Sequence, residues 1–212
     1  MTLAETSQNL AELIVQPSEV VNGLSLHDYA NGWWQWAGSM PPQLSAVRDN
    51  TGEHCAQGQS GAVWFLAGGY GSSRIDRTCS IPDGRHLFFP VINMLQEYWP
   101  ATGADCPDAK AEAARQNDSF VYLRVILDGS ELEDPQRFRI ASEQCFDPYK
   151  LTPPEAGAPR NVVAATDGYW IMLRPLPPGP HRLEFRAFYT NPDEALGDMV
   201  QNISYTLDIQ AP

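Results

Sequence analysis

Three side chains in the first half of the chain have the chemistry needed for acid/base catalysis: His54, Asp76 and Glu97. Imidazole and carboxyl groups exchange protons with a substrate when their pKa values lie near the working pH. All three residues lie in or near segments rich in turn residues, and loops often carry catalytic groups. They define one hypothesis, a hydrolase or lyase in which these residues act as general acids and bases.

A serine nucleophile and a metal site are further hypotheses for the same part of the chain. Residues 58–62 (Gly-Gln-Ser-Gly-Ala) approach the G-x-S-x-G motif, which requires a strand before the serine and a helix after it. Here a polar segment precedes Ser60 and an apolar, strand-like run follows, so a glycine-rich turn is the favoured interpretation. His54 and His86 lack the H-x-H or H-E-x-x-H spacing of common metal sites. We therefore predict no metal site, and no motif identifies a cofactor.

Tryptophan is abundant, with six residues in a chain of 212. Aromatic side chains either fill a core or offer flat faces to sugars and other ligands. Trp33, Trp34 and Trp36 cannot all share one face of a helix, so we expect at least one of them to be partly exposed. Trp33 and Trp64 fit the core better. Trp99, which follows a predicted strand, is the better candidate for a ring that faces a ligand.

The leading hypothesis is a binding module for a small molecule or glycan that uses aromatic side chains in loops. We expect its surface to be formed by residues 49–61, 68–77 and 93–100, which carry polar and aromatic groups. The candidate ligand-binding residues are Gln57, Gln59, Trp64, Arg77, Asn93 and Trp99. The acid/base enzyme is the first alternative, and a structural or self-assembling protein is the second. The oligomeric state is left open.

Two segments have the pattern of helices. Ser25 is a typical N-cap with Asp28 three residues later, and apolar residues follow at helical spacing until Pro41. This pattern predicts a helix over residues 25–37. An Ala-rich segment with proline at its start predicts another helix over residues 107–116.

The predicted strands are short and separated by segments rich in glycine and proline. They span residues 62–67, 78–81, 86–92, 120–127, 138–141, 169–173, 181–189 and 202–209. Residues 148–160 are Pro-rich and predict a long surface loop. Because the strands do not alternate with helices, a doubly wound α/β fold is disfavoured. We predict a mainly β protein, an antiparallel β-sandwich of jelly-roll or Ig-like type with one or two packed helices. Residues 1–22 are expected to be a loosely ordered N-terminal segment, and residues 23–212 a single sandwich domain.

The four cysteines, Cys55, Cys79, Cys106 and Cys145, permit several pairings, and their spacing does not choose among them. No C-x-x-C pair is present, which excludes a zinc ribbon or a thioredoxin-like motif. An even number of cysteines in a β protein rich in glycine and proline favours two disulfides and an oxidising compartment. Buried free thiols are the alternative.

The formal net charge of −12 argues against nucleic acid and anionic membranes as partners, because both repel an acidic surface. No apolar run reaches the roughly 18 residues of a membrane-spanning helix. Residues 1–10 lack the basic and apolar regions of a signal peptide. We expect a secreted or periplasmic protein whose signal is absent from this chain, and a cytoplasmic location stays open.

Several segments together resemble an uncharacterised family of bacterial and fungal proteins. They are WWQW at 33–36, DNTGEHCAQGQSGAVWFLAG at 49–68, RTCSIPDG at 77–84 and LFFPVIN at 87–93, with shorter similarities at 128–129, 168–170 and 178–181. The resemblance covers about residues 25–210 and includes Cys55 and Cys79. It implies a β-rich protein that is secreted in many members, and it transfers no catalytic residue.

Overall fold

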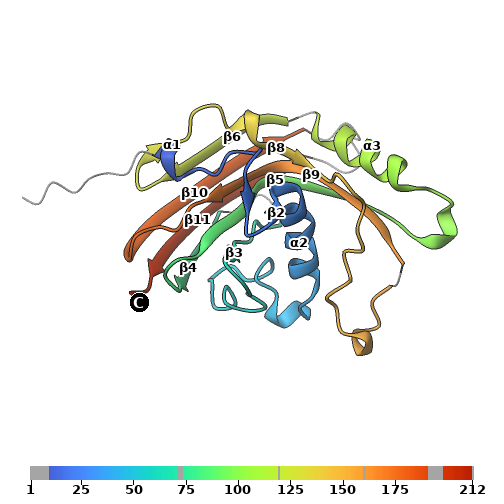
Figure 1. Cartoon of the computed structure of the whole chain (residues 1–212), viewed down its shortest axis with the longest axis horizontal. Helices are drawn as coiled ribbons and strands as arrows, with labels where there is room; N and C mark the ends of the chain where they lie inside the picture. Colours follow the sequence, from blue (N-terminus) through green and yellow to red (C-terminus); the bar gives the residue numbers. More distant parts are fainter. Residues whose placement is uncertain (1–9, 71–73, 119, 160, 191–197, 212) are drawn as a thin grey trace, which may run out of the picture.

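Two β-sheets pack face to face, and helix α2 lies against the outer face of one of them (Figure 1). The computed structural model describes residues 10–70, 74–118, 120–159, 161–190 and 198–211. Within these residues strands outweigh helices. The predicted fold class, a mainly β sandwich with packed helices, is therefore confirmed.

In the described part of the chain, one sheet has five strands in the order β4-β11-β10-β6-β7 and the other has four in the order β3-β5-β9-β8. The five-stranded sheet contains β4 (Ile75–Ile81), β11 (Met199–Ile209), β10 (Gly179–Tyr189), β6 (Phe120–Leu127) and β7 (Ser130–Glu131). The four-stranded sheet contains β3 (Val63–Phe65), β5 (His86–Tyr98), β9 (Val163–Leu173) and β8 (Arg139–Ala141). Most neighbouring strands are antiparallel, as predicted. Strand β4 nevertheless pairs with β11 in parallel, and β3 pairs with β5 in parallel, because the chain crosses between the sheets after β3 and again after β4.

Strands β5 and β9 are buried on both faces, since the five-stranded sheet covers one face and α2 covers part of the other. In β5, Leu87 and Phe89 face the core between the sheets, whereas Phe88 faces the helix. Phe88 stacks there on Trp170 of β9, with ring centroids 5.2 Å apart. This double burial accounts for the continuous apolar run of β5 that follows His86.

Helix α2 (Leu26–Gly38) begins where its capping signal predicts. The Ser25 hydroxyl accepts a hydrogen bond from the Asp28 amide, and the Asp28 carboxylate accepts one from the Ser25 amide, which completes a capping box. The buried face of the helix consists of Leu26, Tyr29, Ala30, Trp33 and Trp36. Trp34 is the partly exposed member of the tryptophan group, and this confirms the expectation that the three could not share one face.

Helix α3 (Cys106–Asn117) packs on β5 and β9 through Ala109, Ala113 and Asn117, and Asp105 caps its N-terminus. The remaining helices are short: α1 (Leu10–Leu13), and the 3₁₀ helices η1 (Pro42–Leu44), η2 (Pro100–Thr102), η3 (Pro135–Phe138) and η4 (Pro154–Ala156). No helix among the described residues has the length and apolar character needed to cross a membrane.

Residues 1–22 were expected to be loosely ordered. From Leu10 onward, the chain instead packs against the sandwich. Leu13, Ile14 and Val15 are buried, and the Val15 amide donates a hydrogen bond to the Met172 carbonyl of β9. The chain then forms a hairpin of β1 (Val20–Val21) and β2 (Leu24–Ser25). Burial of these apolar side chains against the four-stranded sheet offsets the entropy lost on ordering the segment. Residues 1–9 lie outside the described residues.

All four cysteines lie within the described residues, and they form two disulfides, Cys55–Cys79 and Cys106–Cys145. The first joins the loop before β3 to strand β4. The second joins the first residue of α3 to the segment between β8 and β9. The prediction of two disulfides is confirmed, and the sequence had left their pairing open.

Candidate functional site

The three residues of the acid/base hypothesis lie in separate places. Asp76 is on the outward face of β4, where its carboxylate pairs with Arg74 at 2.8 Å. Glu97 is near the end of β5 in the other sheet and faces away from the core between the sheets. His54 is half-buried in the loop before β3, and its backbone amide donates to the Asp49 carboxylate. The structure therefore does not bring the three together as one acid/base site.

A metal site does not emerge from the histidines either. Across the described ranges, no group of three or more His, Cys, Asp or Glu side chains is placed to hold a metal ion. His86 is half-buried next to the N-terminal segment. Burial lowers the pKa of its imidazole, Arg174 lowers it further, and Glu19 opposes both effects.

Arg77, predicted to bind a ligand, is 2% exposed and uses its guanidinium to connect loops. Its nitrogens donate to the carbonyl oxygens of Asp49, Ala67 and Gly68 at 2.7 to 2.9 Å. It also donates to the Tyr205 hydroxyl at 3.0 Å. These contacts hold the ends of the loops that follow α2 and β3, so we assign Arg77 a positioning role in the fold.

Other predicted ligand-binding residues also contact the protein itself. The Gln59 amide donates to the carbonyl oxygens of Cys55 and Phe65 and accepts from the Phe65 amide nitrogen, as a turn-stabilising residue would. Gln57 is exposed, and its backbone carbonyl accepts a hydrogen bond from the Trp36 indole. Trp64 is 7% exposed and belongs to the core between the sheets. Ser60 precedes a strand rather than a helix, which does not fit a nucleophile elbow.

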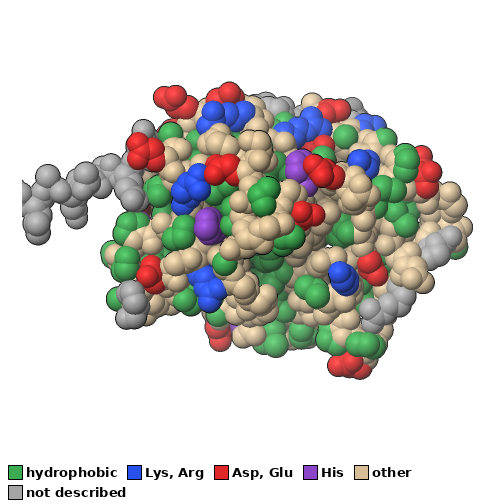
Figure 2. Space-filling model, in the orientation of Figure 1, with side chains coloured by type: hydrophobic (Ala, Val, Ile, Leu, Met, Phe, Trp, Pro, Cys, Tyr) green, Lys and Arg blue, Asp and Glu red, His purple; other side chains and the backbone are tan. Residues whose placement is uncertain are grey.

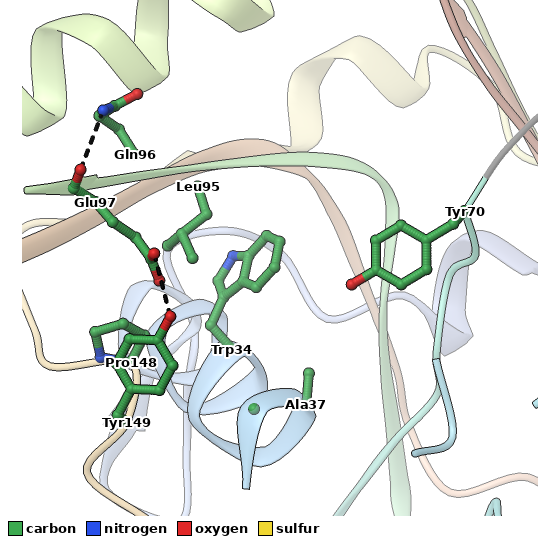
Figure 3. Close-up of a pocket in the computed structure, with 9 residues that line it drawn as sticks. Trp34, Ala37, Tyr70, Leu95, Gln96, Glu97, Pro148 and Tyr149 are labelled. Carbon is green, nitrogen blue, oxygen red and sulfur yellow. Dashed lines mark hydrogen bonds between the residues drawn. The ribbon is translucent and has the colours of Figure 1, made fainter. Parts of the chain in front are cut away.

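A cleft of about 380 Å³ opens between α2, the outer part of β5 and two loops. We call it the aromatic cleft. Its walls carry Trp34 from α2, Leu95 and Glu97 from β5, Tyr70 from the loop after β3, and Tyr149 from the loop before β9. Figure 3 shows Glu97 and Tyr149 on one side of Trp34 and Tyr70 on the other. Three aromatic rings from distant parts of the sequence therefore surround one space.

The Trp34 ring is held by hydrogen bonds to the sheet beneath it. Its indole Nε1 donates to the Thr166 hydroxyl at 2.8 Å, and that hydroxyl donates to the Met94 carbonyl at 2.6 Å. The Thr166 amide in turn donates to the Ser142 hydroxyl at 2.8 Å. Because these partners lie on β9, β5 and the end of β8, the ring is fixed in orientation before any ligand arrives.

Glu97 is the carboxyl group of the aromatic cleft, and the Tyr149 hydroxyl donates to its Oε2 atom at 3.2 Å. Burial raises the pKa of Glu97. The hydrogen bond from Tyr149 partly opposes this, and the nearby charge of Asp147 adds to it. Burial also raises the pKa of Tyr149, and the charge of Glu97 raises it further. Because the Tyr149 hydroxyl donates to Glu97, the pair presents acceptor oxygens to a polar ligand, and it presents a donor when Glu97 is protonated.

A smaller space of about 70 Å³ adjoins the aromatic cleft and shares Trp34, Ala37 and Tyr70 with it. We call it the annex. Asn93 of β5 lines the annex, and so do Met199 and Gln201. The side-chain amide of Gln201 already has hydrogen-bond partners. Its oxygen accepts from the Gly69 amide at 3.0 Å, and its nitrogen donates to the Gly69 carbonyl at 2.7 Å.

Trp99, predicted to face a ligand, is 50% exposed and caps the short helix η2, outside the residues that line the cleft. Glu97 and Asn93, by contrast, were both named from the sequence and both line the cleft or its annex. The sequence did not single out Tyr149 or Tyr70, although Tyr70 lies in the segment 68–77 that was predicted to form part of the surface. A tyrosine in a loop carries no periodic signal, so only the fold brings these two rings opposite each other.

The molecular surface carries charges of both signs. On the face shown in Figure 2, acidic and basic side chains alternate rather than gathering into one patch of a single sign. This face therefore offers no extended basic surface of the kind that recognises nucleic acid, in keeping with the net charge of −12.

Comparisons with family models, curated proteins and solved structures find no match to this chain. The resemblance to an uncharacterised family therefore remains an expectation, and a function has to be argued from the aromatic cleft and its annex.

Proposed function

We propose that the aromatic cleft binds a carbohydrate and that the protein is an extracytoplasmic glycan-binding module. The observation that carries the proposal is the meeting of Trp34, Tyr70 and Tyr149 in one cleft, although they come from three separate segments. Ligand sites are typically lined by aromatic side chains with a few polar groups that set the orientation of the ligand. A sugar ring matches such a site, because its faces carry C–H groups and its rim carries hydroxyls.

The polar groups of the cleft support a neutral, hydroxyl-rich ligand. Glu97 and Tyr149 form a hydrogen-bonded pair whose oxygens accept hydrogen bonds from hydroxyl groups, and Glu97 donates one when it is protonated. Burial raises the pKa of Glu97, so this carboxyl group keeps its proton to a higher pH than a solvent-exposed carboxyl group does.

The proposed location rests on the cysteines. Disulfides persist in oxidising compartments such as the periplasm and the extracellular space, and are rare in the cytosol. Both pairs of cysteines are joined in this protein. This supports an extracytoplasmic module that meets glycans outside the cytoplasm.

A direct test screens oligosaccharides of several classes for binding, then measures affinity by isothermal titration calorimetry with those that bind. Tyr70 is 70% exposed, so Tyr70→Ala removes a cleft ring with little effect on the fold. We expect it to weaken binding about tenfold, in line with roughly 1.4 kcal/mol for the loss of a stacked ring. Tyr122→Ala is the matched control, because Tyr122 is 46% exposed on β6 in the other sheet.

Binding that is equally tight in the Tyr70→Ala protein and the wild type would overturn the proposal. So would the absence of binding to every oligosaccharide tested. Equal weakening in both tyrosine variants would point to a general surface effect and would also contradict a site at the cleft.

A hydrolase or lyase acting at the same cleft is a second candidate, favoured by the raised pKa of Glu97. A half-buried carboxyl group that retains its proton is suited to act as a general acid. Glycoside hydrolysis ordinarily uses a pair of carboxyl groups, and Glu97 is the one carboxyl among the described residues that line the cleft. Release of shorter oligosaccharides, detected by mass spectrometry and abolished in Glu97→Gln, would favour this enzyme over the binding module.

A further inference from the structure

Asn93, which lines the annex, carries a hydrogen-bond donor that the described residues leave unused. The side-chain nitrogen Nδ2 of Asn93 is buried and has no hydrogen-bond partner among the described residues. A buried donor without a partner costs free energy, because it has given up its hydrogen bonds to water. A ligand acceptor placed at this atom would recover that cost.

The fold explains why Asn93 lacks a partner from the neighbouring strand. Asn93 lies opposite Gly168 in the register of β5 and β9. Gly168 has no side chain to offer, and a Cβ atom at that position would come within 2.8 Å of both Asn93 Cβ and Trp170 Nε1. Gly168 therefore offers Asn93 no side-chain acceptor across the strand pair.

The rest of the annex is mainly apolar and small. Met199, Pro90 and the ring of Trp33 line it together with Asn93. The indole nitrogen of Trp33 is already used, since it donates to the Leu66 carbonyl at 2.9 Å. A volume of about 70 Å³ exceeds the roughly 30 Å³ that one water molecule occupies in the liquid, so the annex has room for a small group of a few atoms.

We infer that the annex receives the acetamido group of an N-acetylated sugar, with its carbonyl oxygen accepting a hydrogen bond from Asn93 and its methyl group packing against Met199 and Pro90. This inference rests on the carbohydrate binding proposed above and names the class of sugar. The matching features are one buried donor for the carbonyl and an apolar lining for the methyl. A sugar with a hydroxyl at that position fills less of the annex and buries less apolar surface.

The walls shared by the annex and the aromatic cleft would set the orientation of the ligand. The annex and the aromatic cleft share Trp34, Ala37 and Tyr70, so a sugar ring stacked on Trp34 or Tyr70 can direct a substituent towards Asn93. The backbone on the far side of the annex is fixed by the two hydrogen bonds between Gln201 and Gly69. The subsite is therefore held in shape by the fold itself.

The test compares two trisaccharides that differ only in this substituent: the β-1,4-linked trimer of N-acetylglucosamine and the β-1,4-linked trimer of glucose. Calorimetric titration of the wild-type protein is expected to give about tenfold tighter binding of the N-acetylated trimer. In Asn93→Leu, the preference for the N-acetylated trimer over the glucose trimer should be lost. Asn202→Leu on β11, away from the cleft, is the matched control and should retain the preference.

A second measurement keeps the test independent of how well the leucine variant folds. In ¹⁵N-labelled wild-type protein, the side-chain NH₂ resonances of Asn93 should shift when the N-acetylated trimer is added and move less with the glucose trimer. Equal affinity for both trimers would overturn the acetamido subsite and leave carbohydrate binding intact. Failure of both trimers to bind, while another oligosaccharide binds, would also overturn the subsite. If no oligosaccharide binds at all, the proposed function itself fails.

Discussion

The hydroxyl of Tyr149 lies 3.2 Å from the carboxylate oxygen Oε2 of Glu97 and joins the loop before β9 to the end of strand β5. This contact closes one side of the aromatic cleft. Because burial raises the pKa of Glu97 whereas the bond from Tyr149 lowers it, the two residues influence each other's proton affinity. Variants at either position should therefore change stability in a manner that depends on pH.

Replacing Glu97 by glutamine should make the protein relatively more stable as pH rises. The folded-state pKa of Glu97 is raised, so the stability gained from its protonated form is complete below its ordinary value of 4.5 and is lost as pH rises through the folded-state pKa. The glutamine side chain of the variant does not ionise, so its contribution does not change with pH. The difference in unfolding free energy between Glu97→Gln and wild type, measured by urea titration, should grow in favour of the variant from about pH 4.5 upward. Glu155→Gln at an exposed site is the control, and a difference that stays constant with pH would contradict the expectation.

Replacing Tyr149 by phenylalanine should raise the pKa of Glu97 further. The tyrosine hydroxyl donates to the carboxylate and so stabilises its charged form, and phenylalanine removes that bond while keeping the ring. We expect ¹³C-detected NMR titration of the Glu97 carboxyl to give a higher pKa in Tyr149→Phe than in wild type, and the fold to lose about 1 kcal/mol. A lower or unchanged pKa in the variant would show that the hydroxyl does not interact with Glu97 in solution.

Local signals predicted the elements whose ends are set by nearby residues. Helix α2 begins at Leu26, directly after the predicted N-cap Ser25, because its capping box lies within a few residues and needs no distant partner. The outer parts of β5 and β9 were missed, since these strands were predicted over 86–92 and 169–173 but extend over 86–98 and 163–173. Polar residues such as Gln96 interrupt the apolar pattern there. Pairing between the two strands and packing of α3 keep them extended, and neither is visible in a local window.

The candidate site could be predicted only in part for the same reason. Asn93 and Glu97 were singled out from the sequence, and the partial exposure of Trp34 followed from helical geometry. Tyr149 lies in a Pro-rich stretch predicted only as a loop. Tyr70 lies within residues 68–77, which were predicted to form part of the surface, but the residue itself was not singled out. Long-range contacts place these two tyrosines beside α2, and no spacing rule records such contacts.

Arg77 should be among the side chains that contribute most to stability. Its guanidinium is buried and donates to several backbone carbonyls and to the Tyr205 hydroxyl. Arg77→Met would remove all of these bonds, and the Ala67 carbonyl would keep only the Tyr205 hydroxyl as a donor. We therefore expect a loss of about 3 kcal/mol or more in unfolding free energy, measured by urea titration with tryptophan fluorescence. Arg74→Met removes only an exposed ion pair with Asp76 and should leave the midpoint nearly unchanged. Similar midpoints for the two variants would refute the positioning role of Arg77.

Removing either disulfide should lower the stability of the fold. The Cys55–Cys79 and Cys106–Cys145 bridges close segments of 24 and 39 residues. Constraint of the unfolded chain predicts a stabilisation of about 3–4 kcal/mol for each, slightly larger for the longer segment. The double variants Cys55→Ala/Cys79→Ala and Cys106→Ala/Cys145→Ala, compared with wild type by urea titration, measure these losses.

Alkylation followed by intact-mass analysis provides the matching control on the wild-type protein. No cysteine should react before reduction, and all four should react after reduction in denaturant. Each double-alanine variant should likewise show no reactive thiol before reduction, because the remaining pair stays joined. Alkylation of unreduced wild-type protein would contradict the two bridges and would remove the support that they give to an extracytoplasmic location.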